Sequence, residues 1–102
     1  DDHLRNHGFL LTPNGWLLAP AYDINPVPDS YGLSLNISEY SNELDLDLAR
    51  EVSEMFRILP SEREKIISHI KRSVQNWRSH ATKLAINTEE MDLMENAFRL
   101  AV

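Results

Sequence analysis

The 102-residue chain contains no cysteine, which excludes disulfide scaffolds, thiolate catalysis, zinc knuckles and iron–sulfur clusters. Its uninterrupted apolar runs span only a few residues, so no segment has the length of a membrane span or the pattern of a signal peptide. Basic residues are also scarce, at ten against sixteen acidic ones, and the net charge of −6 argues against autonomous binding to nucleic-acid phosphates. We therefore expect a cytoplasmic protein without membrane contacts.

Glycine and proline are few and unevenly placed. All three glycines and four of the five prolines lie in residues 1–44, whereas residues 45–102 hold one proline and long stretches of helix formers. The composition predicts a β-rich segment at 1–44 and a helical block at 45–102, which together form one mostly α, α+β unit.

A β-hairpin is predicted around residues 13–15, Pro-Asn-Gly, because apolar segments flank this turn on both sides. Proline suits the second position of a type I turn and glycine suits a left-handed closing residue. We therefore expect a three-residue loop with Thr12 opposite Trp16. Extended outward, this register brings Asn6 and Asp23, seventeen residues apart, to the open end of the hairpin.

The sequence after a proline-rich loop predicts one further strand and three helices. Leu33, Leu35 and Ile37 alternate with polar residues, which is typical of a short half-buried strand. The first helix should cover about 46–58, capped by an aspartate at position 45 or 47.

The second helix should begin at the capping box of residues 61–64 and continue to about residue 84, with Trp77 on its apolar stripe. The third should start near Asn87 or Thr88 and carry Met91 and Phe98. Each helix has one apolar face, so we expect the three to pack around a shared core.

The densest group of polar side chains lies at the N-terminus, where Asp1, His3, Arg5 and Asn6 fall within six residues and the hairpin returns Asp23 to them. A carboxylate beside a carboxamide oxygen forms an all-oxygen site of the kind that Mg²⁺ prefers. A further aspartate and a cationic side chain suit phosphoryl transfer. Protein kinases place four residues between a catalytic-loop Asp and a metal-binding Asn, and a second metal-binding Asp follows a hairpin. Asp1, Asn6 and Asp23 have this spacing.

Segments 1–10 and 15–24 resemble the C-terminal lobe of HipA-like kinases, the toxins of bacterial type II toxin–antitoxin pairs. Their Asp-x-His-x-x-Asn core is also similar to the catalytic loop of phosphatidylinositol kinases. The resemblance extends through segment 41–49 and the helix bearing Trp77, and so covers nearly the whole chain. It implies the C-lobe of a protein-kinase-like fold.

The resemblance also implies a role for each residue of the N-terminal group. Asp1 would orient or deprotonate the substrate hydroxyl, and His3 would lie near the transferring phosphate. Asn6 and Asp23 would hold Mg²⁺ that bridges the phosphates of ATP, with Arg5 as a further cofactor-binding residue. The implied substrate is serine or threonine on a protein, and the implied partner is a DNA-binding antitoxin through which any DNA contact would be indirect.

A kinase also needs a phosphate-binding loop and a lysine paired with a carboxylate. The chain begins at its catalytic loop, and Lys65, Lys71 and Lys83 all lie in the helical block, so we expect a fragment that is inactive alone. A non-catalytic helical interaction module remains the alternative. The kinase hypothesis requires the side-chain oxygens of Asn6 and Asp23 to lie within about 4–5 Å of a common point.

Overall fold

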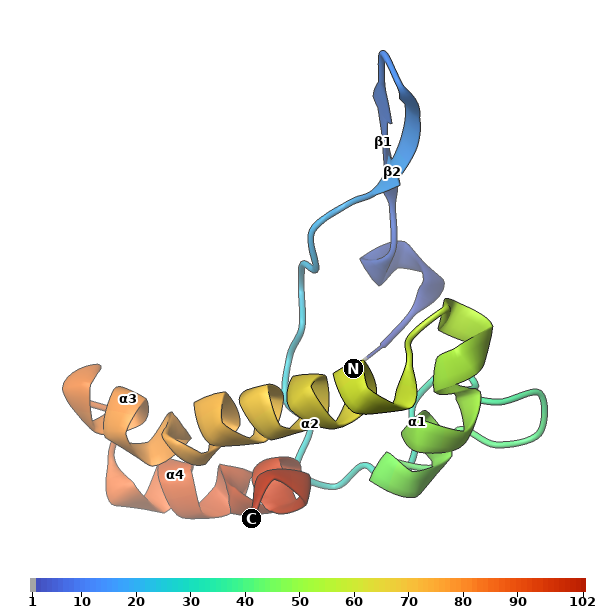
Figure 1. The fold of residues 1–102 in the computed structure, drawn as a ribbon. Coiled ribbons are helices and arrows are strands. Elements are labelled where there is room, and N and C mark those ends of the chain that lie inside the picture. The colour runs from blue at the N-terminus through green and yellow to red at the C-terminus, as the bar shows by residue number, and fades with distance from the viewer. Residues whose placement is uncertain (1) are drawn as a thin grey trace.

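A hairpin joined by extended segments to a layer of helices makes up residues 2–102, the part of the chain that the computed structural model describes (Figure 1). The radius of gyration is 15.7 Å, against about 13 Å for a folded chain of this length, because the hairpin projects away from the helices. This architecture confirms the mostly α, α+β prediction. In chain order the elements are the 3₁₀ helix η1 (Leu4–Asn6), strands β1 (Phe9–Thr12) and β2 (Gly15–Leu18), helix α1 (Leu46–Val52), the 3₁₀ helix η2 (Ser53–Phe56), helices α2 (Pro60–Gln75), α3 (Trp77–Lys83) and α4 (Thr88–Met94), and the 3₁₀ helix η3 (Glu95–Ala101).

The hairpin forms where the sequence predicts it, but the predicted register is wrong by one residue. Thr12 pairs with Gly15 rather than with Trp16, so the loop has two residues, 13 and 14. The Thr12 hydroxyl explains this, because it donates to the Gly15 carbonyl at 2.8 Å and accepts from the Asn14 amide at 3.3 Å. Proline then occupies the turn itself, where its missing N–H is not needed, and Gly15 takes up the left-handed closing conformation with φ of 113°.

Both faces of the hairpin are apolar. Residues opposite each other share a face and alternate residues point to opposite faces, so each side of the two strands presents large side chains. A two-stranded hairpin is marginally stable by itself in water. The six side chains, each between 54% and 70% exposed, are Phe9, Leu11, Trp16 and Leu18 on one face and Leu10 and Leu17 on the other.

The segment 33–37 is a loop, so the predicted strand is wrong. Within residues 2–102, the only β-pairing beside this segment is an isolated antiparallel bridge between Gly32, which precedes it, and Glu43. The Leu33 amide donates to the Asn42 main-chain oxygen at 2.8 Å, and the Asn42 side-chain amide donates back to the Leu33 carbonyl at 2.6 Å. Asn42 thus pairs both main-chain groups of Leu33, and the Ile37 amide donates to the Ser41 carbonyl at 2.8 Å, so turn contacts replace strand pairing at both ends of the segment. The alternation in burial that motivated the prediction is nonetheless present along 33–37.

The first predicted helix is shorter than expected. Asp45 caps α1 by accepting from the Asp47 amide at 2.8 Å, which selects between the two predicted caps. After Val52 the helix tightens into η2 and ends at Arg57, whose φ of 59° is left-handed. The regular helix therefore covers half of the predicted span 46–58, and the left-handed residue stops it before residue 58.

The second predicted helix is split at Asn76 into α2 and α3. The Asn76 side chain donates to the Arg72 carbonyl at 3.0 Å, and this local bond competes with the regular helical pattern. The third helix begins at Thr88 as predicted, because the Asn87 side chain accepts from the Glu90 amide at 2.8 Å.

Helices α1 and α2 are joined by a charged network. Arg50 donates to both carboxylate oxygens of Glu64, at 3.0 and 3.3 Å, and to Asp47 at 2.6 Å. The hydrogen bonds from Arg50 hold the pKa of the Glu64 carboxyl below its ordinary value, and Arg63 contributes in the same direction. The two carboxylates are solvent-exposed and the two arginines are half-buried, so this network fixes geometry more than it adds stability.

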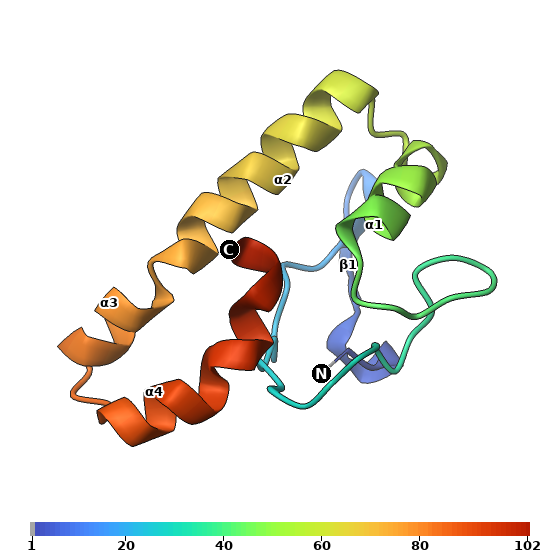
Figure 2. The same ribbon diagram turned by 90° about the horizontal axis from the view of Figure 1, so that it is seen from below.

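The shared helical core is present but shallow. Trp77 of α3 stacks on Phe98 of η3 with ring centroids 4.3 Å apart, and the Arg78 guanidinium lies over the indole with its Cζ 4.8 Å from the ring centroid. Seen from below, α2–α3 and α4–η3 form two arms joined at the turn between α3 and α4 (Figure 2). The apolar residues that are buried within residues 2–102 are Val52, Ala81, Met91 and Ala101, and each keeps a small exposed fraction.

The accessible surface shows how open this core is. The chain exposes 8235 Å², roughly 2,300 Å² more than the ~5,900 Å² expected for a folded monomer of its mass. None of the helices between residues 2 and 102 combines the length and apolar character needed to cross a membrane.

Candidate functional site

The candidate site lies at the stem of the hairpin, where η1 leads into β1 and the chain returns from β2. Strand pairing ends with the Ala19 amide donating to the Gly8 carbonyl at 2.8 Å. Beyond that point the Tyr22 hydroxyl donates to the Arg5 carbonyl at 2.6 Å. This side-chain bond continues the pairing where the ladder stops, and it brings Asp23 beside η1.

Asn6 and Asp23 are in direct contact at the stem. The Asn6 Nδ2 donates to the Asp23 Oδ2 at 3.2 Å and to the Asp23 carbonyl at 3.3 Å. On its other side the Asn6 Oδ1 accepts from the His3 amide at 2.9 Å. The predicted meeting of these two residues is confirmed, even though the hairpin register is shifted, because both lie beyond the ladder and meet through side chains.

Asp23 is held in an unusual conformation. Its φ of 54° is left-handed, a region that aspartate visits more readily than most residues and that is concentrated at functional sites in folded proteins. The Asn25 side chain donates to its Oδ1 at 2.6 Å, while Asn6 donates to its Oδ2. Two neighbouring amides therefore orient the two oxygens of one exposed carboxylate.

The residue types at the stem are among those that bind a magnesium ion. Asn6 and Asp23 supply an amide oxygen and a carboxylate, and Mg²⁺ prefers oxygen ligands and is commonly bound by one or two carboxylates together with substrate phosphates. A cation shared by the two side chains would replace the hydrogen bond between them. It would also require the Asn6 amide to turn, because its Nδ2 faces Asp23 and its Oδ1 accepts from the His3 amide. Among residues 2–102 no group of three or more His, Asp or Glu side chains is arranged to hold a metal ion, so the stem offers a partial ligand set rather than a complete cage.

The remaining residues of the predicted site are placed unevenly. His3 is half-buried and its main-chain amide is used to fix Asn6. Arg5 is exposed, and its carbonyl is fixed by Tyr22. Asp1 lies outside the described residues. The catalytic role of Asp1 and the phosphate and cofactor roles of His3 and Arg5 stay predictions.

Three features of the stem are missing from the sequence-based prediction. The Asp2 carboxylate contacts the His7 Nε2 at 2.6 Å, and Asn25 and Tyr22 make the bonds described above. Tyr22 could have been inferred from its place beside the stem in either register. The Asp2–His7 contact has no periodic signal, because it depends on the turn that η1 inserts between the two residues.

The family model of the HipA-like C-terminal domain matches residues 1–78 of the chain. The matched region contains the stem, the hairpin, the loop, α1, α2 and the first residues of α3. Comparisons with curated proteins and with solved structures gave no match. Since the family match covers most of the chain and includes the stem residues Asn6 and Asp23, the chain belongs to the HipA-like C-terminal domain family.

Proposed function

We propose that this chain supplies the catalytic-loop and metal-binding residues of an ATP-dependent serine/threonine protein kinase. The observation that carries the proposal is the contact between Asn6 and Asp23, whose side chains meet at 3.2 Å from opposite sides of the hairpin stem. Membership of the HipA-like family, which is generally a kinase family, supports the same reading.

The proposal gives each stem residue a physical task. Asn6 and Asp23 hold Mg²⁺, which when bound neutralises charge on the ATP phosphates. The left-handed backbone of Asp23 and its bond from Asn25 hold the carboxylate in one orientation before a cation binds. Asp1 orients the hydroxyl of a serine or threonine on the protein substrate, while His3 and Arg5 provide cationic or hydrogen-bonding character near the phosphates.

The proposed setting follows from the family. We propose a cytoplasmic toxin that is paired with an antitoxin protein, with any DNA contact made through the antitoxin. A second candidate function is a non-catalytic helical interaction module. The large apolar side chains exposed along the hairpin and the helices favour that alternative, because such surface is typical of binding sites.

Metal binding can be tested on the 102-residue chain with Mn²⁺ as a paramagnetic substitute for Mg²⁺. We expect NMR signals of the stem to broaden first, and Asp23→Asn to weaken this effect at least about tenfold because it removes the only charged ligand proposed here. Asp29→Asn, an exposed loop carboxylate, is the matched control and should leave the broadening unchanged. Equal broadening in both variants would remove the stem from consideration as a metal site.

Phosphoryl transfer is tested on the full gene product with radiolabelled ATP and Mg²⁺. We expect Asp23→Asn and Asn6→Ala each to reduce labelling of serine or threonine by about 100-fold or more, since each removes an interaction that positions the transferring group. Asp29→Asn should keep normal activity. Labelling that is absent from the unaltered protein, or insensitive to both stem variants, would favour the interaction module.

A further inference from the structure

The segment that leads away from the candidate site is short and has restricted backbone freedom. This linker, residues 24–28, connects Asp23 to the turn that begins at Pro28. Pro26 and Pro28 fix their own φ and also restrict the residue before each of them, so most of the linker has little freedom. A proline-rich spacer extends for about 3.1 Å per residue, so the linker forms a semi-rigid connection of up to about 15 Å.

The far end of the linker is bound by η3, an element that is distant in the sequence, and the linker runs to it from the hairpin (Figure 1, Figure 2). The Asn96 Nδ2 donates to the Pro28 carbonyl, and the Arg99 guanidinium donates to the Ser30 carbonyl at 2.7 Å. Because a 3₁₀ helix has three residues per turn, Asn96 and Arg99 lie on the same face of η3. Residues 21–27 are exposed, whereas Pro28 and Ser30 are half-buried where η3 meets them.

Arg99 makes its contacts with main-chain carbonyls. Besides binding Ser30, its guanidinium donates to the Asn96 carbonyl at 2.9 Å, and the side chain is half-buried. No carboxylate within residues 2–102 forms an ion pair with it. A hydrogen bond from a charged donor is about twice as strong as one between neutral groups. The guanidinium therefore holds backbone, which fits a role in positioning rather than in charge pairing.

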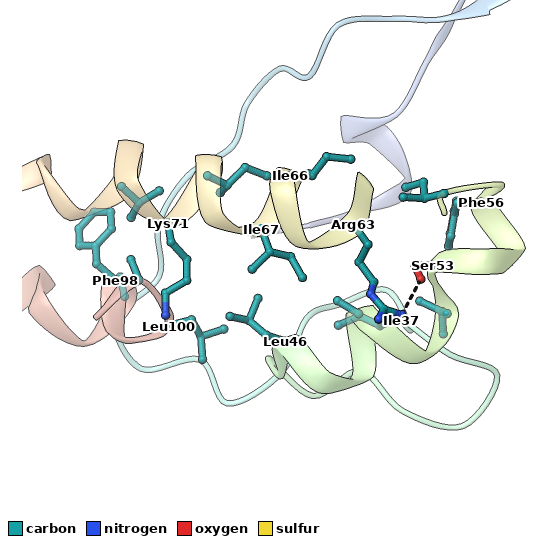
Figure 3. A pocket seen from close by; sticks show the side chains of 17 residues that line it. Ile37, Leu46, Ser53, Phe56, Arg63, Ile66, Ile67, Lys71, Phe98 and Leu100 are labelled. Carbon is teal, nitrogen blue, oxygen red and sulfur yellow. Dashed lines mark hydrogen bonds between the residues drawn. The ribbon is translucent and has the colours of Figure 1, made fainter. Parts of the chain in front are cut away.

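η3 is attached to the neighbouring helices by separate contacts rather than by a packed core. The Gln75 side chain donates to the Ala101 carbonyl at 2.7 Å, and Trp77 stacks on Phe98. An open apolar cavity of about 490 Å³ lies between α2 on one side and α1, η2 and η3 on the other (Figure 3). Well-packed protein interiors contain few voids larger than a water molecule, so packing does not fix η3 from the side of the cavity. The position of η3 therefore depends on individual contacts, including the two with the linker and its turn.

We propose that Asn96 and Arg99 are positioning residues for Asp23 and act through the linker. With both bonds made, η3 fixes the far end of the linker, and the linker limits the directions in which the Asp23 carboxylate can face. With the bonds broken, the linker pivots about the left-handed backbone of Asp23, and the contact with Asn6 is made less often. This effect on the stem requires no metal, whereas its consequence for phosphoryl transfer rests on the proposed function. The family match ends at residue 78, so η3 lies outside the matched region.

NMR of the 102-residue chain measures the geometry of the stem directly. The perturbing double variant combines Asn96→Asp, which cannot donate to a carbonyl at neutral pH, with Arg99→Ala. The stem signals, which are the side-chain amide signals of Asn6 and the backbone signals of Asp23, should shift because the bond between these residues is made less often. Gln75→Ala is the matched control, since it removes a bond to η3 from the opposite, α2 side and should leave the stem signals unchanged.

Metal binding and a conservative variant separate positioning from a general loss of structure. We expect Mn²⁺ to bind at least about threefold more weakly to the double variant, the scale of effects transmitted through a network of contacts. Arg99→Lys keeps a charged donor, so its stem signals and Mn²⁺ affinity should stay closer to those of the unaltered chain than those of Arg99→Ala do. In the full gene product, the double variant should raise the Mg²⁺ concentration for half-maximal labelling about threefold and leave labelling at saturating Mg²⁺ nearly unchanged.

Circular dichroism, and Trp77 fluorescence in a Trp16→Phe background, check that η3 stays in contact with α3 in each variant. Unchanged stem signals in the folded double variant would overturn the proposal. Equal shifts in Gln75→Ala would do the same, and so would equal shifts in Arg99→Lys and Arg99→Ala, since a charged donor at position 99 would then make no difference. Failure of the proposed function is a separate result. If the unaltered chain binds no Mn²⁺, the stem is not the metal site, and the stem signals still decide whether η3 positions Asp23.

Discussion

The stack between Trp77 and Phe98 connects α3 to η3, and we expect Phe98→Ala to lower the free energy of unfolding by about 2 kcal/mol. A fully buried Phe→Ala replacement costs about 3–5 kcal/mol, and Phe98 is only half-buried, so roughly half of that loss applies. The rings are 4.3 Å apart and inclined by 21°, an arrangement that contributes about 0.5–1.5 kcal/mol beyond the buried area. The contribution of ring stacking to the free energy of unfolding should therefore be measurable separately from that of the buried area.

Phe98→Leu provides that separation, because it keeps an apolar side chain and removes the ring. We expect it to cost about 1 kcal/mol, close to the stacking contribution alone. Both variants are compared by urea denaturation in the Trp16→Phe background, which leaves Trp77 as the single fluorophore, with circular dichroism as a second probe. A loss below about 0.5 kcal/mol for Phe98→Ala would refute the reasoning, and so would identical losses for the two variants.

Three further changes have directional outcomes. Gly15→Ala should destabilise the hairpin by about 1 kcal/mol, because the φ of Gly15 is 113° and alanine rarely adopts it. Gly8→Ala is the control, since its added Cβ meets only ordinary contacts and should leave hairpin stability nearly unchanged. NMR chemical shifts of the strands report the folded fraction of the hairpin in both variants. The free energy of unfolding, measured in urea, should fall as pH drops below about 4.5. Protonation of Glu64, whose pKa is lower in the folded state, then removes its stabilising contact with Arg50. Glu64→Gln should make that decline shallower. Asn87→Ala should cost about 1 kcal/mol by removing the cap of α4, measured by thermal denaturation.

Local chemistry accounts for the parts of the fold that the sequence predicts well. The apolar segments around a Pro-Asn-Gly turn are sufficient to place the hairpin, and asparagine at position 87 is sufficient to start α4. The hairpin register was mispredicted because it depends on the Thr12 hydroxyl, whose bonds to Gly15 and Asn14 arise only once the turn has closed. Propensity rules contain no term for such a bond.

Longer-range contacts explain the other errors. The segment 33–37 has the alternation of a strand, yet Asn42 and Ser41 bond the main chain at its two ends and no neighbouring strand pairs with it within the described residues. The break at Asn76 leaves the apolar period of the helix intact, so a periodicity argument passes over it. For the candidate site, spacing was enough to bring Asn6 to Asp23, but the left-handed conformation of Asp23 and its bond from Asn25 follow from the folded stem.

The hairpin is apolar on both faces, and this affects the order in which parts of the molecule fold and assemble. A hairpin can form in about 1–10 μs, but two strands with large apolar side chains on both faces persist only when each face is covered. Asn6 and Asp23 lie at its base and meet only while the strands stay paired. We therefore expect the contact between them to be among the last to become permanent. Until other protein surface covers both faces of the hairpin, the two side chains would not stay aligned. The candidate site would therefore become competent only after that covering surface has assembled.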